Sequence, residues 1–342
     1  GMKFGLWVEL EMANMDSDLY RAHPDWLIQT PGRSLSHGRH QYVLDFSRAE
    51  VVDHIYEMIA KILSESKVSY IKWDMNRSIT ECYSLALAPE RQGEVFHRYV
   101  LGLYSLYERL TKNFPHILFE SCASGGARFD AGMLYYAPQC WTSDDSDAAE
   151  RIKIQYGTSF GYPVVSMGAH VSAVPNHQLN RITPLSTRGN VAFFGAFGYE
   201  LDLQKLTHKE RELIQEQIRF MKRYRSVIQF GTFYRLQSPF EHNIAAWMVV
   251  SEDQRTAIVG YYKILNDVNC EYRRLRLKGL DPERVYHVDQ TGTCHGGDEL
   301  MNLGLITTDS SAGQPQSGQP EEGFEVCSDF WSKLYVLTSD NQ

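Results

Sequence analysis

Short apolar segments alternate along this chain with segments whose apolar residues recur at helical spacing, and this alternation restricts the possible folds more than any other feature. Strands are predicted at 3–8, 68–74, 117–122, just before Trp141, 162–167 and 191–201, and helices at 49–64 (with Ser47 as N-cap), 92–112, from 148 onward and 209–225. Such alternation is typical of parallel βα units, most simply of a (β/α)8 TIM barrel. Catalytic residues are then expected at the carboxyl ends of the strands.

A change of pattern near residue 229 predicts two domains. Residues 1–228 supply six predicted strands, whereas a closed barrel needs eight, so two strands of this partial catalytic barrel are expected to be missing. Residues 229–342 contain short alternating segments punctuated by Gly, Asp and Asn, which favours an antiparallel β-sandwich. Within them, 309–323 is rich in Ser, Gly, Gln and Pro and is expected to be a flexible insertion.

Composition narrows the kind of ligand. The net charge is −8, and no run of Lys or Arg suggests nucleic acid or an anionic membrane as a partner. A neutral small molecule is therefore expected, and 20 Tyr and 6 Trp suit a sugar, although aromatic residues also fill ordinary cores. Six cysteines without CxxC spacing disfavour zinc and disulfide frameworks, and no apolar run has membrane length, so a cytoplasmic location is expected.

The predicted strand at 68–74 ends in a polar cluster. Lys72, Asp74 and Asn76 are two residues apart, and because strand side chains alternate, the three share one face. Each would cost free energy if buried without a partner, so they are expected to line a polar pocket. Asp74 is the candidate for the chemistry.

Asp144 follows a second strand, and two carboxylates at strand ends suit a retaining glycosidase. Asp74 would attack the anomeric carbon, and Asp144 would protonate the leaving oxygen and later activate water. Lys72 on the same face favours an ionised Asp74, whereas Asp145 and Asp147 beside Asp144 favour a retained proton. The simpler alternatives are a strand-end ion pair between Asp74 and Lys72, and a helix N-cap role for Asp144, which Asp147 fits better.

An ordered series of motifs resembles the retaining α-galactosidases of glycoside hydrolase family 36. The motifs are 17–26 (SDLYRAHPDW), 43–45 (VLD), 72–77 (KWDMNR), 120–122 (ESC), 125–130 (GGARFD), 141–144 (WTSD), 154–158 (IQYGT) and 167–178 (MGAHVSAVPNHQ). The resemblance covers the predicted barrel, and the sandwich fits the family's C-terminal domain. It implies no metal and no cofactor.

The resemblance assigns Asp74 as nucleophile and Asp144 as acid/base. The substrate-binding residues that it implies are Trp7, Arg39, Lys72, Asn76, Cys122, Gly125 and Trp141. Each has a simpler alternative: a core aromatic for the tryptophans, a solvated cation for Arg39, a turn amide for Asn76, an inert thiol for Cys122 and backbone freedom alone for Gly125.

Departures from the family pattern leave several functions open. Val8-Glu-Leu-Glu-Met12 stands where members usually have Phe-Glu-Pro-Glu-Met, Asp145 is an extra carboxylate, and Ser124 replaces a common glycine. The resemblance implies that the family's N-terminal domain and its first two barrel strands are absent, so the chain looks N-terminally truncated. Its open sheet edge favours a homo-oligomer. Expected functions are hydrolysis of terminal α-galactosides such as melibiose or raffinose, the related α-N-acetylgalactosaminidase or transglycosylase reactions, or a silent carbohydrate-binding or subunit-interaction module.

Overall fold

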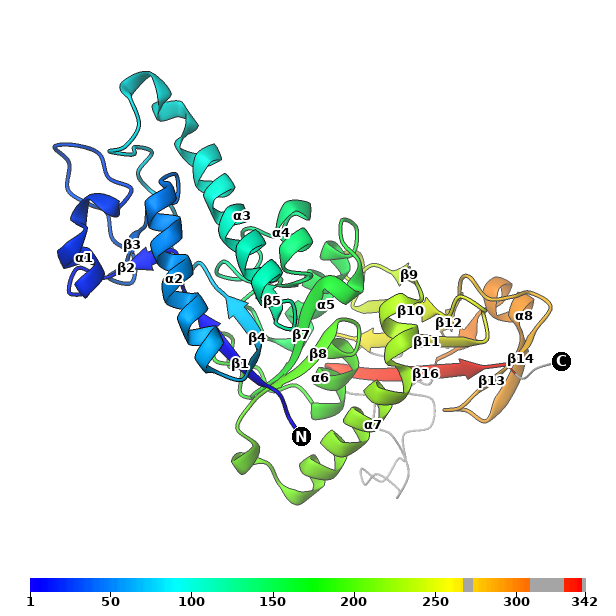
Figure 1. The fold of residues 1–342 in the computed structure, drawn as a ribbon. Helices are drawn as coiled ribbons and strands as arrows, with labels where there is room; N and C mark the ends of the chain where they lie inside the picture. Colours follow the sequence, from blue (N-terminus) through cyan, green and yellow to red (C-terminus); the bar gives the residue numbers. More distant parts are fainter. Residues whose placement is uncertain (267–272, 308–328, 340–342) are drawn as a thin grey trace. The chain divides into compact units, whose positions relative to one another are not determined.

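The computed structural model describes residues 1–266, 273–307 and 329–339 (Figure 1). These residues form two compact units, 1–144 and 145–342. The predicted insertion at 309–323 lies outside the described residues, and the predicted domain boundary near 228 stays a prediction. In the described part of the chain, no helix is long and apolar enough to cross a membrane.

Four strands of the first unit pair in parallel, in the order β1 (Phe4–Val8), β4 (Val68–Trp73), β5 (Leu118–Ser121) and β6 (Gln139–Trp141). The intervening elements are β2 (Met12–Ala13), α1 (Asp18–Ala22), a 3-10 turn (Pro24–Trp26), β3 (Tyr42–Val43), α2 (Ala49–Glu65), a 3-10 turn (Pro89–Glu94), α3 (Val95–Asn113) and α4 (Ala131–Tyr136). Parallel strands separated by helices confirm the predicted βα units. The carboxyl ends of these strands therefore meet at one edge of the sheet.

Helix α2 shows how the sequence pattern fixes a local element. Five apolar residues of the helix are buried: Val51, Val52, Ile55, Ile59 and Leu63. They recur at helical spacing, so one face packs into the core of the first unit. The predicted N-cap was wrong, because the helix is preceded by Arg48 without a side-chain cap. The Ser47 hydroxyl instead donates to the buried Asp45 carboxylate at 2.5 Å.

The second unit continues with α5 (Ala148–Thr158), a 3-10 turn (Val164–Ser166), β7 (Met167–Ser172), α6 (Leu185–Ala192), β8 (Ala196–Glu200), a 3-10 turn (Leu203–Lys205) and α7 (His208–Phe230). Strands β7 and β8 pair in parallel. The predicted strand at 162–167 was misplaced, because Pro163 starts the 3-10 turn and the strand begins only at Met167. The strand predicted at 191–201 is shorter, because its first residues end α6.

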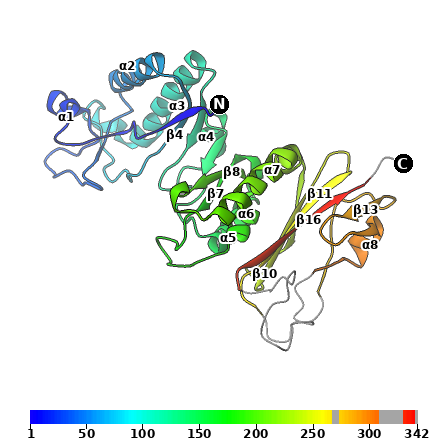
Figure 2. The same ribbon diagram turned by 90° about the horizontal axis from the view of Figure 1, so that it is seen from below.

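The C-terminal part consists of antiparallel sheets, as predicted. One sheet has the order β14 (Thr293–Gly296), β13 (Val285–Val288), β16 (Trp331–Thr338), β11 (Thr256–Lys263), β10 (Ile244–Val250) and β9 (Thr232–Gln237). A second sheet pairs β12 (Arg274–Leu275) with β15 (Leu305–Ile306), and α8 (Gly297–Asn302) lies between β14 and β15 in the chain. Both sheets contribute to one apolar core. Figure 2 shows β10, β11 and β16 side by side.

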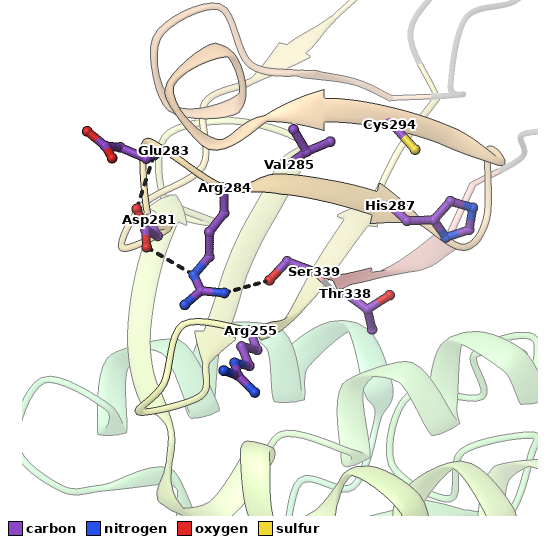
Figure 3. A pocket seen from close by; sticks show the side chains of 9 residues that line it. All are labelled: Arg255, Asp281, Glu283, Arg284, Val285, His287, Cys294, Thr338 and Ser339. Atoms are coloured by element: carbon purple, nitrogen blue, oxygen red, sulfur yellow. Dashed lines mark hydrogen bonds and ion pairs between the residues drawn. The ribbon is translucent and has the colours of Figure 1, made fainter. Parts of the chain in front are cut away.

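A polar pocket of about 450 Å³ lies against β13 in this unit (Figure 3). In its wall the Arg284 guanidinium donates to Asp281 Oδ2 at 2.9 Å and lies 3.5 Å from the Ser339 hydroxyl. The arginine and the aspartate are therefore paired with each other, which is typical of a structural surface network. Both carboxylates predicted to do chemistry lie elsewhere, in the first unit.

Candidate active site

Strand register brings the predicted polar side chains together at the carboxyl edge of the first unit's sheet. Trp7 on β1 stands opposite Lys72 on β4, which stands opposite Glu120 on β5. The Asp74 amide continues this ladder by donating to the Val8 carbonyl at 2.9 Å. Asp74 is therefore held just beyond the end of β4, which stops one residue before the predicted end of this strand.

The Asp74 carboxylate is buried, with 6% of the residue exposed. Trp7 Nε1 donates to Asp74 Oδ2 at 3.2 Å, whereas Oδ1 is buried without a hydrogen-bond partner of good geometry in the described part of the chain. Burial raises the Asp74 pKa, but the Asn76 amide, the Cys122 thiol, the Trp7 indole and the Lys72 charge lower it, and the net pKa shift is downward. One carboxylate oxygen is thus anchored by Trp7, and the carboxylate as a whole is held in its ionised form.

Lys72 does not form the strand-end ion pair with Asp74 that was the simpler alternative. Its Nζ lies 3.6 Å from Glu120 Oε1 and 4.9 Å from the centre of the Trp141 ring. Its charge nevertheless contributes to the lowered pKa of Asp74. Lys72 therefore lies close to the Glu120 carboxylate and to the Trp141 ring, and its charge acts on the nucleophile candidate Asp74.

Asn76 and Arg39 meet at a residue that the sequence reasoning did not single out. Asn76 Nδ2 and Arg39 Nη1 both donate to Glu9 Oε1 at 2.8 Å. The Ser124 hydroxyl donates to Asn76 Oδ1 at 3.0 Å. The Asn76 amide therefore bonds to two other side chains, which a simple turn amide does not require. The Arg39 guanidinium forms an ion pair with Glu9, so it is not merely a solvated loop cation.

Asp144 is exposed and lies three residues after the end of β6. Trp141 Nε1 donates to Asp144 Oδ1 at 3.1 Å, and Trp141 itself is buried. The helix N-cap role belongs to Asp147, whose Oδ1 accepts from the amides of Ala149 and Glu150. The alternative of Asp144 as an N-cap is thereby removed, whereas its role as acid/base stays a prediction.

The loop after β5 links the two carboxylates. Cys122 is buried, and burial, followed by the Asp74 charge, raises the pKa of its thiol so that it stays protonated. Gly125 has φ +88°, and a Cβ there would lie 2.7 Å from Ser143 Cα and 3.0 Å from the Asp144 nitrogen. The backbone of this loop thus approaches Asp144 so closely that only glycine fits.

Two charged residues of the site, Glu9 and Glu120, were missed from sequence. Glu9 is two residues after Trp7 and so shares the alternation that identified Lys72, Asp74 and Asn76. Glu120 is buried and lies 3.1 Å from Gln139 Nε2 and 3.6 Å from Lys72 Nζ. No arrangement of three or more His, Cys, Asp or Glu suited to a metal ion occurs within 1–266, 273–307 and 329–339.

Family models match both parts of the chain. Residues 1–231 match the family model described as Melibiase. Residues 244–337 match the model of the glycosyl hydrolase family 36 C-terminal domain. Together they cover the βα units and the antiparallel sheets.

Curated relatives are α-galactosidases. The chain is 56% identical over 305 residues to α-galactosidase AgaA of Geobacillus stearothermophilus, covering 89% of this chain and 42% of the relative. It is also 48% identical to α-galactosidase Mel36A of Lactobacillus acidophilus, again over 89% of this chain and 42% of the relative. The chain therefore spans less than half the length of these relatives.

Solved structures agree with the sequence relatives. The crystal structure of the family 36 α-galactosidase AgaA from Geobacillus stearothermophilus matches 99% of this chain and 45% of its own length, with a TM-score of 0.92 and 52% identity. The α-galactosidase from Lactobacillus brevis matches 100% of this chain, with a TM-score of 0.93 and 51% identity. The described fold is thus that of a TIM-barrel-type domain with a C-terminal sheet domain, and the chain belongs to glycoside hydrolase family 36.

Proposed function

We propose that this chain carries the catalytic centre of a retaining α-galactosidase, with Asp74 as nucleophile and Asp144 as acid/base. The environment of Asp74 supports this proposal most strongly. A buried carboxylate that stays ionised, with Oδ2 anchored by Trp7 and Oδ1 without a hydrogen bond of good geometry, keeps a lone pair for the attack.

In the first step, Asp74 Oδ1 forms a bond to the anomeric carbon of galactose while the bond from that carbon to the glycosidic oxygen breaks. Asp144 gives its proton to the departing oxygen, so the leaving group departs as a neutral alcohol. Asp144 is exposed, which lets it reach the leaving group, and the Trp141 indole orients its carboxyl through Oδ1. The product of this step is a galactosyl ester of Asp74.

In the second step, the Asp144 carboxylate takes a proton from water, and the water oxygen bonds to the anomeric carbon. The ester bond to Asp74 breaks, which regenerates both side chains and releases galactose with its original configuration. A sugar hydroxyl in place of water gives transglycosylation, which stays an alternative outcome of the same step.

The remaining predicted residues surround the sugar in this proposal. Trp7 is 52% exposed although its Nε1 is bonded to Asp74, so its ring face is free to pack on a pyranose. Arg39 and Lys72 supply donors to hydroxyl groups, and Asn76 supports the nucleophile Asp74. The loop containing Cys122 and Gly125 lies beside the hydroxyl nearest the reacting carbon, and its shape decides between galactose and N-acetylgalactosamine.

Related structures support the proposed class of substrate. Crystal structures of AgaA variants from Geobacillus stearothermophilus contain raffinose in one case and stachyose in another. Each of these variants has one aspartate replaced, and the two replaced positions are separated by the same number of residues as Asp74 and Asp144. We therefore propose terminal α-galactosyl groups of small oligosaccharides, such as melibiose and raffinose, as substrates.

The test is hydrolysis of an aryl α-galactoside by the purified chain. Asp74→Asn removes the attacking charge with little change in shape, and it is expected to lower kcat/KM by about a thousandfold or more. Asp16→Asn is the matched control, because Asp16 is exposed in the same unit. Turnover that Asp74→Asn leaves intact would contradict the assignment.

A silent carbohydrate-binding or subunit-interaction module is the second candidate function, and one observation favours it. Strand β1 is at the end of its sheet, paired with β4 alone among the described strands, and Phe4 on it is 58% exposed. An exposed sheet edge of this kind suits pairing with another chain, in keeping with the proposed homo-oligomer. Absence of turnover in both the unmodified chain and Asp74→Asn, together with retained binding of galactose, would favour this second function.

A further inference from the structure

We propose that Glu9 is a positioning residue that sets the orientation of the Asn76 amide and holds the loop carrying Arg39 in place beside Asp74. The inference rests on the proposed function, since it concerns the same reaction. Glu9 acts on Asp74 through Asn76 and Arg39, because in the described part of the chain no contact joins Glu9 to Asp74 directly.

Glu9 accepts three hydrogen bonds in a nearly buried position. Its side chain is 10% exposed. Oε1 accepts from Arg39 Nη1 and Asn76 Nδ2, both at 2.8 Å, and Oε2 accepts from Gln41 Nε2 at 2.9 Å. Three donors on one carboxylate, including one guanidinium, provide the compensation that a buried charge needs.

The orientation of the Asn76 amide follows from the chemistry of Glu9. An ionised carboxylate accepts hydrogen bonds only, so Asn76 must turn its Nδ2 toward Glu9. Oδ1 of the same amide then accepts from the Ser124 hydroxyl at 3.0 Å. The flipped amide would place Oδ1 against Glu9 and lose both bonds, so its population is low.

This orientation matters for the nucleophile. With Nδ2 toward Glu9, the second N–H of the same nitrogen is the amide group available to a neighbouring carboxylate. The Asn76 amide is also the largest of the influences that oppose burial and lower the pKa of Asp74. The flipped amide would present a partial negative charge in its place. The other charged or titratable groups acting on Asp74 are Lys72 and Cys122.

Glu9 also holds the loop that contains Arg39. Arg39 and His40 have φ of 54° and 59°, a left-handed conformation that costs free energy in residues other than glycine. Arg39 and Gln41, on either side of His40, are both bonded to Glu9. Because the Arg39 side chain is 53% exposed and Glu9 is its ion-pair partner in the described part of the chain, the guanidinium depends on Glu9 for its position.

Glu9→Gln tests the inference, because glutamine has the same size but carries an amide that can donate to a flipped Asn76. We expect kcat/KM for an aryl α-galactoside to fall about tenfold or more, the size of one lost charge-assisted hydrogen bond. The acid limb of the pH profile should also move to higher pH, since Asp74 loses part of the support for its charge. In an Asn76→Ala background, Glu9→Gln should have a smaller effect, because the amide that it orients is gone.

The control is Glu57→Gln, which removes the same charge from an exposed position on α2 and should leave kcat/KM and the pH profile unchanged. If Glu9→Gln behaves like Glu57→Gln while the unmodified chain is active, the inference is wrong. If the unmodified chain has no activity, the proposed function fails separately, and crystal structures decide the inference. Displacement of Arg39 from residue 9 in Glu9→Gln would support it, and an unmoved Arg39 would overturn it.

Discussion

The indole Nε1 of Trp7 donates to Oδ2 of Asp74 at 3.2 Å, across two neighbouring parallel strands. A tryptophan that is 52% exposed is thereby fixed at its polar edge by the residue proposed to react. In the proposed reaction, one side chain joins the platform for the sugar to the nucleophile. The proposal therefore makes the position of the sugar ring and the charge of Asp74 depend on the same contact.

Trp7→Phe should separate these two effects, because phenylalanine keeps an aromatic face but has no N–H. The folded pKa of Asp74 is lowered partly by this donor, so its loss should raise the pKa. Since the reaction needs ionised Asp74, the acid limb of kcat/KM should then move to higher pH, with a decrease of about tenfold on that limb. Trp7→Ala should in addition raise KM. An acid limb that stays in place in Trp7→Phe would show that the contact does not support the charge of Asp74.

Asp144→Ala should slow substrates according to their leaving groups. A dinitrophenyl α-galactoside needs little protonation and should keep most of its rate, whereas hydrolysis of melibiose should fall by about 100-fold or more. Asp145→Asn keeps the Asp144 carboxyl and should change the ratio of the two rates far less than Asp144→Ala. The ratio of the two kcat/KM values measures the effect, and an equal loss on both substrates in Asp144→Ala would mean that the acid is another residue.

Gly125→Ala should damage the loop between Cys122 and Asp144. At φ +88° an alanine costs about 1–3 kcal/mol, and its Cβ would lie 2.7 Å from Ser143 Cα, so the backbone must shift. We expect a lower free energy of unfolding in urea together with lower kcat. Gly93→Ala is the matched control, because a Cβ there meets nothing within 4 Å and no positive φ is involved. Equal stability and activity in the two variants would contradict the proposed close approach to Asp144.

Local patterns were sufficient for much of the fold and part of the site. The spacing of Lys72, Asp74 and Asn76 predicted one shared strand face, but β4 ends at Trp73, so only Lys72 lies in the strand and the other two residues follow it. The strand prediction was wrong where an apolar segment also contained a residue that favours a turn. The run at 162–167 contains Pro163, which starts a 3-10 turn and delays β7 to Met167. An apolar segment alone does not distinguish these two outcomes.

The sequence by itself determined the family and the order of the βα units, because motifs and the spacing of apolar residues are properties of short segments. Only the tertiary structure decided which groups are partners. It paired Lys72 with Glu120, brought Arg39 and Asn76 together on Glu9, and left Asp74 Oδ1 without a hydrogen bond of good geometry in the described part of the chain. These contacts join segments far apart in the chain, so they depend on strand register and loop packing rather than on local spacing.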